Sequence, residues 1–174
     1  MSDITYIATT SSWVYLAIII DLHSRHIIGW QLADHMRAEL VCQAIEKARD
    51  HRGCLPKLFH SDQGSQYVSE EFENVLSSVT ISMSRKENCW DNAVAESFFG
   101  TLKTEHKNHE TYKNIREARM SLFQYIEGFY NHNPDILRWE IFHHLSLKKR
   151  LHNPCPFYGV QVKPIVMLYA SDVD

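Results

Sequence analysis

The sequence predicts an α/β domain with a mixed sheet, chiefly from the order of its residue patterns. Three β-prone runs come first, at 3–10, 13–22 and 26–32. The middle run is apolar on both faces, as in a central strand. Helical spacing then alternates with short apolar runs as far as residue 130. A chain of 174 residues that is 44% hydrophobic can bury a core around such elements.

The three N-terminal runs are expected to form an antiparallel meander. The first run alternates its side chains between two faces, which is the β period. Ser11 and Ser12 then allow a tight turn, and residues 21–25 turn the chain a second time. Short polar connections of this kind join antiparallel neighbours, whereas parallel strands need a longer crossover.

Two helices and two short strands should follow the meander. Residues 38–52 change to a helical period, and Gly53 is expected to end that helix. A short strand at 57–61 leads to Asp62, and Ser69 should cap a helix over about 70–77. A fifth strand is expected at 81–84, and a last helix at about 115–130.

A helix predicted to begin at Asn92 carries the strongest chemical signal. One side of it is apolar, formed by Val94, Ala95, Phe98, Phe99 and Leu102. The other side presents Glu96, Gly100, Lys103 and Lys107 at spacings of four, three and four residues. A carboxylate followed by a glycine and two lysines suits a metal ligand followed by phosphate contacts, although a solvated helix face shows the same spacing. Asp91 or Asn92 is expected to cap this helix.

Composition limits the function classes. The formal net charge is −3, so DNA binding would depend on local basic patches or on a further domain. The four cysteines have no C-x-x-C pair, which argues against a zinc knuckle or a disulfide framework and predicts the reducing cytoplasm. No stretch is long enough to span a membrane, and no signal segment is recognisable at the start.

The segment S-M-S-R-K-E-N-C-W-D-N-A-V-A-E-S-F-F-G-T-L-K, at 82–103, resembles the catalytic helix region of bacterial insertion-sequence transposases of the DDE type. These have a catalytic core similar to retroviral integrases. The resemblance continues in D-I-T-Y-I at 3–7, in the segment at 15–30, in H-S-D-Q-G-S-Q-Y-V-S at 60–69, and in Y-I-E-G-F-Y-N at 125–131. It implies a ribonuclease H-like fold, a mixed five-stranded sheet flanked by helices. It also implies an integrase catalytic core at 1–131, followed by a divergent tail at 132–174 whose order stays open.

The resemblance also implies a site. Asp3, Asp62 and Glu96 match the catalytic acids and would hold two divalent cations, Mg²⁺ or Mn²⁺. Hard cations prefer oxygen ligands, and a pair of them suits phosphodiester chemistry. The implied DNA contacts are Arg85, Lys86, Asn92, Lys103 and Lys107. Plainer roles remain open, with Asp62 as a turn residue, Asp3 as a frayed terminal acid and Asn92 as a helix cap.

The implied function is metal-dependent DNA cleavage and strand transfer by in-line attack on phosphodiesters. The expected partners are DNA, as transposon ends and target, and further copies of the chain in an active complex. The leading alternative is a catalytically inactive remnant that retains DNA or partner binding. A ribonuclease H-like nuclease with another substrate and a regulatory binding module are further alternatives.

The chain also departs from the family pattern in ways that favour a truncated copy. It starts almost at Asp3, and the connection from Asp62 to Glu96 is a little shorter than usual. Glu87 stands where the family usually has glycine, which would strain the loop and oppose phosphate. No family motif follows Asn131. One hypothesis is that the tail is frameshifted, and comparison with the other reading frames of the gene would test it.

Overall fold

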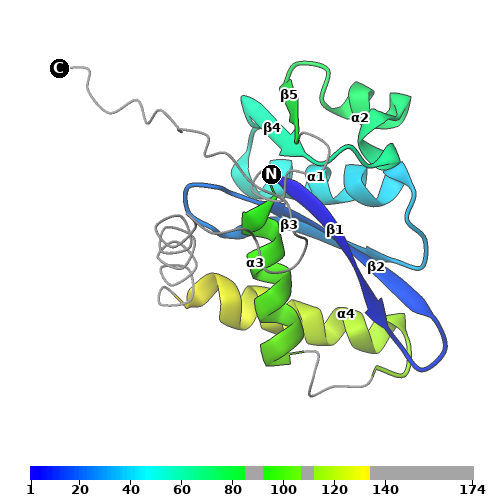
Figure 1. Ribbon diagram of the computed structural model, residues 1–174. Coiled ribbons are helices and arrows are strands. Elements are labelled where there is room, and N and C mark those ends of the chain that lie inside the picture. Colours follow the sequence, from blue (N-terminus) through cyan, green and yellow to red (C-terminus); the bar gives the residue numbers. More distant parts are fainter. Residues whose placement is uncertain (85–91, 107–111, 134–174) are drawn as a thin grey trace, which may run out of the picture.

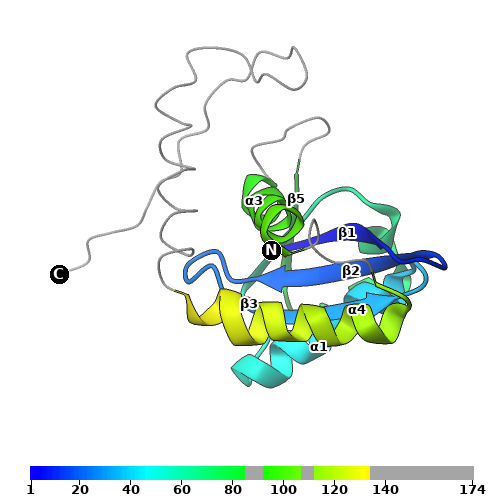
Figure 2. The same ribbon diagram turned by 90° about the horizontal axis from the view of Figure 1, so that it is seen from below.

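The computed structural model describes residues 1–84, 92–106 and 112–133, except for the side chains of residues 105 and 106. They form an α/β fold whose sheet has helices on both faces (Figures 1 and 2). The elements in chain order are β1 (Ser2–Ala8), β2 (Trp13–Ile20), β3 (Ile27–Ala33), α1 (Ala38–Arg52), β4 (Leu58–Ser61), α2 (Glu70–Val75), β5 (Thr80–Met83), α3 (Ala93–Thr101) and α4 (Ile115–Phe123). The ribonuclease H-like α/β class predicted from the sequence is confirmed.

The five strands lie in the spatial order β3-β2-β1-β4-β5, in two hydrogen-bonded sheets of three and two strands. The predicted meander is confirmed, because β1, β2 and β3 pair antiparallel. A parallel ladder joins β4 to β5. Since β4 has four residues, it offers few backbone groups, and it lies beside β1 without a ladder between them. The mixed sheet is therefore interrupted between β1 and β4, which differs from the single five-stranded sheet expected.

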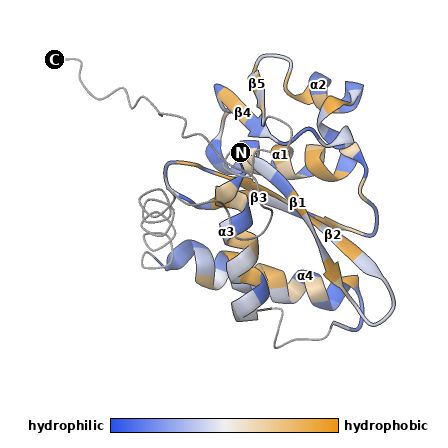
Figure 3. Ribbon diagram, in the orientation of Figure 1, coloured by the Kyte–Doolittle hydropathy of each residue, from blue (hydrophilic) through white to orange (hydrophobic). Residues whose placement is uncertain are grey.

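Two apolar clusters fill the two faces of the sheet. Leu16, Ile18 and Ile20 of β2 point to the face covered by α3 and α4. Ala17 and Ile19 point to the face covered by α1 and α2. The strand is thus buried on both faces, as its sequence predicted, and Figure 3 shows apolar residues along it. This double burial makes β2 the centre of the core.

Two glycines set the position of α1. A side chain at Gly29 of β3 would lie 2.7 Å from the backbone nitrogen of Ala48, so only glycine lets the helix pack this close. Gly53 ends α1 as predicted, with φ at +73° and its N–H donated to the Arg49 oxygen at 2.7 Å. The helix therefore begins and ends where the sequence indicated.

The free edge of β3 is covered by side chains from the last helical segment. Arg119 of α4 donates to the Leu32 oxygen at 2.6 Å. Asn131 accepts from the Ile27 nitrogen at 2.9 Å and donates to the Ile27 oxygen at 3.0 Å, as a neighbouring strand would. These bonds occupy backbone groups that could otherwise pair with another chain. The 125–131 motif therefore has a structural role here, in fixing the chain after α4 to the sheet.

Arg119→Met is expected to lower the free energy of unfolding by about 1–2 kcal/mol, because a part-buried carbonyl loses a charged donor while the apolar stem is kept. Urea titration measures this. Arg116→Met on the exposed side of the same helix is the matched control and should change little. Equal effects of the two substitutions would show that the edge contact contributes nothing.

Candidate active site

Asp3 lies in an ordered strand. It is opposite Ile18 in the ladder between β1 and β2, so the alternative of a frayed terminal acid is wrong. Its Oδ1 accepts the Ile4 N–H at 2.7 Å, and its Oδ2 accepts from Asn92 Nδ2 at 2.6 Å. Both carboxylate oxygens are thus held by amide donors. The carboxylate has a fixed orientation near the start of α3.

The environment of Asp3 disfavours its negative charge. Burial raises its pKa to about 6, and the Ile4 hydrogen bond only partly offsets this. The charges of Asp62 and Glu96 raise the pKa further, because both acids are close enough to repel that of Asp3. The structure therefore brings the three predicted acids, from three separate elements, into one electrostatic neighbourhood.

Asp62 follows β4 and organises the turn that comes next. Its Oδ1 accepts the Gly64 N–H at 2.9 Å. A side chain at Gly64 would lie 3.0 Å from that oxygen and 2.9 Å from Oε1 of Gln66, so these two side chains would have to shift to admit one. Asp62 is therefore a turn residue, and its Oδ2 still has no hydrogen bond within the described residues. The hydrogen bond that holds the turn therefore leaves one carboxylate oxygen of Asp62 available.

Glu96 lies on the solvent side of α3, as the helical spacing predicted. The opposite stripe is buried, with Ala95, Phe98 and Leu102 almost fully covered. Although the Glu96 side chain is exposed overall, nearby protein removes some of its water and raises its pKa. No other atom of the described structure lies within 4 Å of the place a side chain at Gly100 would take. The helix face beside Glu96 is thus open.

Asn92 precedes α3 but does not cap it with its side chain, so this part of the expectation is wrong. Its backbone oxygen accepts the Glu96 N–H at 3.1 Å, while its side-chain amide is committed to Asp3. The Oδ1 atom is buried and has no hydrogen-bond partner among the described residues. Asn92 therefore ties the start of α3 to β1, one helical turn before Glu96.

Two further side-chain hydrogen bonds support this end of the sheet. The buried Tyr67 hydroxyl hydrogen-bonds Ser2 Oγ at 3.0 Å, next to Asp3. Burial raises the Tyr67 pKa, so the phenol stays protonated. His60 Nδ1 lies 3.1 Å from Ser82 Oγ, which links β4 to β5. Sequence reasoning missed Tyr67 and Ser2, although Tyr67 lies in the 60–69 motif.

The oxygen ligands of the site fit a hard divalent cation, but the three carboxylates are too far apart to share one. A cation would offset the charges of Asp62 and Glu96 that disfavour ionisation of Asp3. The orphaned Asn92 oxygen adds a further acceptor beside Asp3. Within the described residues, no three acid, histidine or cysteine side chains lie close enough to share an ion. Binding of one ion by all three acids would therefore require their carboxylates to come closer together.

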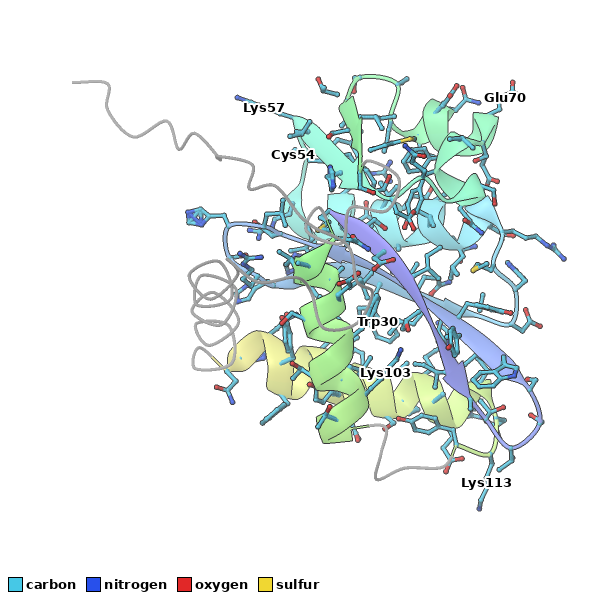
Figure 4. All side chains as sticks on the ribbon, viewed as in Figure 1. Trp30, Cys54, Lys57, Glu70, Lys103 and Lys113 are labelled. Carbon is cyan, nitrogen blue, oxygen red and sulfur yellow. The ribbon has the colours of Figure 1, made fainter. Side chains whose placement is uncertain are left out.

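The predicted DNA contacts are only partly described. Lys103 lies in the turn that continues α3, and its Nζ is 5.4 Å from the centre of the Tyr6 ring on β1 (Figure 4). Arg85, Lys86 and Lys107 lie outside the described residues.

Replacing Asn92 tests the bond between α3 and β1. Asn92→Ala is expected to lower the free energy of unfolding of the metal-free chain by about 1–2 kcal/mol, because a hydrogen bond to a charged group is lost. Asn92→Asp should lower it further, since it places a second carboxylate beside Asp3. Chemical denaturation at neutral pH measures both. An Asn92→Asp variant as stable as the parent would rule the bond out.

Asp3→Asn is expected to stabilise the metal-free chain at pH 7 by about 3 kcal/mol. The folded pKa of about 6 exceeds the ordinary value of 3.8, so the folded state binds the proton more tightly. Asp3 therefore removes stability as the pH rises between these two values, and it removes none below them.

Unfolding titrations of Asp3→Asn at several pH values measure this gain, with Asp34→Asn on an exposed surface as the control. The gain should disappear under acidic conditions. A gain in the free energy of unfolding that does not change with pH would contradict the raised pKa of Asp3.

Comparison with known proteins agrees with this geometry. Residues 1–89 match the family of integrase core domains, and residues 77–134 match a second family of the same description. The chain is 42% identical, over 134 residues that cover 75% of it, to the transposase for insertion sequence element IS904 of Lactococcus lactis. That match covers 53% of the transposase, and the chain spans about half the length of the curated relatives it matches.

Solved structures show the same fold at low sequence identity. A chain of the simian T-cell lymphotropic virus intasome, solved with the PP2A regulatory subunit B56 gamma, is 17% identical with a TM-score of 0.60, covering 97% of this chain and 59% of that one. The HTLV-2 integrase catalytic core domain, solved with magnesium in a dimeric form, is 15% identical with a TM-score of 0.52, covering 71% and 81% respectively. No described helix is long and apolar enough to cross a membrane. The chain belongs to the integrase core domain family, as the transposase-like motifs predicted.

Proposed function

We propose that this chain carries the catalytic domain of a DNA transposase and that Asp3, Asp62 and Glu96 hold two divalent cations, Mg²⁺ or Mn²⁺. The observation that supports this best is the part-buried Asp3 carboxylate, whose pKa is raised by burial and by the charges of Asp62 and Glu96. A fold without a cation would gain little from keeping two further acids where they disfavour the charge of Asp3. The family is integrase-like, and the named relative is a transposase.

Each residue has a distinct task in this proposal. Bound cations would supply an activated water or DNA 3′-hydroxyl and stabilise the leaving oxygen. Asn92 keeps the Asp3 carboxylate oriented, and Asp62 is fixed by the turn at Gly64. Glu96 faces the open side of α3, where a DNA strand can approach. In-line attack forms one oxygen–phosphorus bond while the opposite one breaks, so no covalent protein intermediate is needed.

DNA is the proposed partner, as transposon ends and as target, in a complex with more than one copy of the chain. Lys103 supplies a phosphate contact, joined by Arg85, Lys86 and Lys107 from outside the described residues. The intasome and the dimeric integrase core are assemblies in which a similar fold occurs. Action in the cytoplasm and a domain boundary at residue 131 stay predictions.

A catalytically inactive remnant that keeps DNA or partner binding is the second candidate. It is favoured by the spacing of the acids, since within the described part of the chain no three lie close enough to share an ion. If the three carboxylates cannot come closer together, they cannot share an ion. Such a chain would bind DNA without cutting it.

Mn²⁺ is expected to raise the melting temperature of the full chain and to do so much less for Glu96→Gln, because a ligand that binds only the folded state stabilises it. At a concentration of about 100 times the Kd the gain would be about 2.7 kcal/mol. Glu73→Gln, on the exposed side of α2, is the matched control and should respond like the parent.

Nicking of supercoiled plasmid DNA by the same three proteins then separates the two candidates. The transposase proposal expects Mn²⁺-dependent nicking that Glu96→Gln abolishes. A melt that ignores Mn²⁺, combined with DNA binding and no nicking, would overturn it in favour of the inactive remnant.

A further inference from the structure

Two exposed aromatic side chains and a lysine form a ledge beside the candidate active site. Tyr6 of β1 and Trp13 of β2 are 55% and 54% exposed. Their rings meet edge to face, with centres 5.2 Å apart and planes at 82°. Lys103 Nζ lies 5.4 Å from the centre of the Tyr6 ring. We call these three residues the Tyr6–Trp13–Lys103 ledge.

The hairpin between β1 and β2 holds the two rings in place. Trp13 is opposite Ala8 in the ladder, and Tyr6 is opposite Tyr15, so the rings stand on the same face two residues apart. The connecting turn is fixed by the Thr9 hydroxyl, which donates to the Ser12 oxygen at 2.7 Å. Rings ordered in this way lose little further freedom when a ligand stacks on them.

The ledge and the acids are neighbours along the same two elements. Tyr6 follows Asp3 by three residues of β1, which is about 10 Å along a strand, so the two side chains leave the strand on opposite faces. Lys103 follows Glu96 by seven residues of helix, also about 10 Å. Contacts join α3 and its extension to β1 twice, from Asn92 to Asp3 and from Lys103 to Tyr6. Lys103, labelled in Figure 4, therefore links the helix that carries Glu96 to the ring of Tyr6. A DNA strand that passes from the acids along this helix would meet Lys103 after about three base steps, at 3.4 Å each.

We propose that the Tyr6–Trp13–Lys103 ledge binds unpaired bases at a DNA end, with the rings stacking on bases and Lys103 contacting an adjacent phosphate. This rests on the proposed function. Bases inside a duplex have their faces covered by neighbouring pairs, whereas an unpaired base offers a free face to an aromatic ring. A lysine over a ring adds positive charge where the phosphate lies. The ledge thus distinguishes an open DNA end from a closed duplex.

Measurements of DNA affinity on the full chain separate base binding by the rings from a purely structural role of the rings in the hairpin. Two fluorescent probes are used: a short duplex with a few unpaired thymidines at one 3′ end, and the same duplex with blunt ends. All proteins carry Glu96→Gln so that the probe is not cut. Tyr6→Leu and Trp13→Leu keep apolar bulk and remove the aromatic face, and Tyr6→Phe keeps the face. Phe123→Leu and Lys57→Gln are controls at exposed positions elsewhere.

The leucine variants should bind the overhang probe at least about fivefold more weakly, which is the lower end of the stacking contribution of a base. Their affinity for the blunt probe and their salt dependence should be unchanged. Lys103→Gln should weaken both probes and reduce the slope of log affinity against log salt by about one. Tyr6→Phe and both controls should match the parent, and thermal melts should show that every variant is folded.

The outcomes distinguish the ledge from the proposed function. If the parent binds both probes through Lys103 but the leucine variants bind the overhang equally well, the ledge is overturned and the proposed function stands. An equal loss on both probes also overturns the ledge, because stacking on unpaired bases cannot affect a blunt duplex. If the parent binds neither probe, both proposals are overturned together.

Discussion

The hydrogen bond from Asn92 to Asp3 is the constraint on which the site depends. It joins residues that are far apart in sequence and fixes α3 against the first strand. The buried stripe of α3 holds the helix to the sheet, so Glu96 must face outward on the same side as the bond. The result is a part-buried carboxylate whose charge is disfavoured by burial and by the two neighbouring acids. The same unfavourable charge is the basis of the proposed cation site.

The core and the covered edge of the sheet hold the fold together around the unfavourable charge of Asp3. A central strand buried on both faces and an edge strand covered by Arg119 and Asn131 stabilise the sheet independently of the acids. The acids stand where β1 and β4 lie side by side without a backbone ladder. Small shifts there need not break a ladder, so closing the site around ions would cost little secondary structure. Such shifts would let Asp62 and Glu96, which already raise the pKa of Asp3, come close enough to share an ion with it.

Local patterns predicted what depends on local physics. Gly53 ends α1 and Ser69 caps α2, because turn and cap chemistry is set by a few neighbouring residues. Asn92 shows the limit, since an asparagine before a helix suits a cap equally well and only the tertiary fold brings Asp3 to it. The interruption beside β1 and the pairing of Tyr6 with Lys103 likewise depend on distant elements. Motif resemblance located the acids, and spacing alone could not have done so.

The central claim is that Asp3, Asp62 and Glu96 form one cation site assembled by the junction of α3 with β1. A crystal structure of the full chain grown with Mn²⁺, with anomalous scattering recorded for the metal, tests this most directly. The account predicts two anomalous peaks, about 4 Å apart, with ligand oxygens from all three acids and the Asn92 bond to Asp3 retained. Absence of peaks at saturating Mn²⁺, or a peak that Glu96 does not contact, would contradict it.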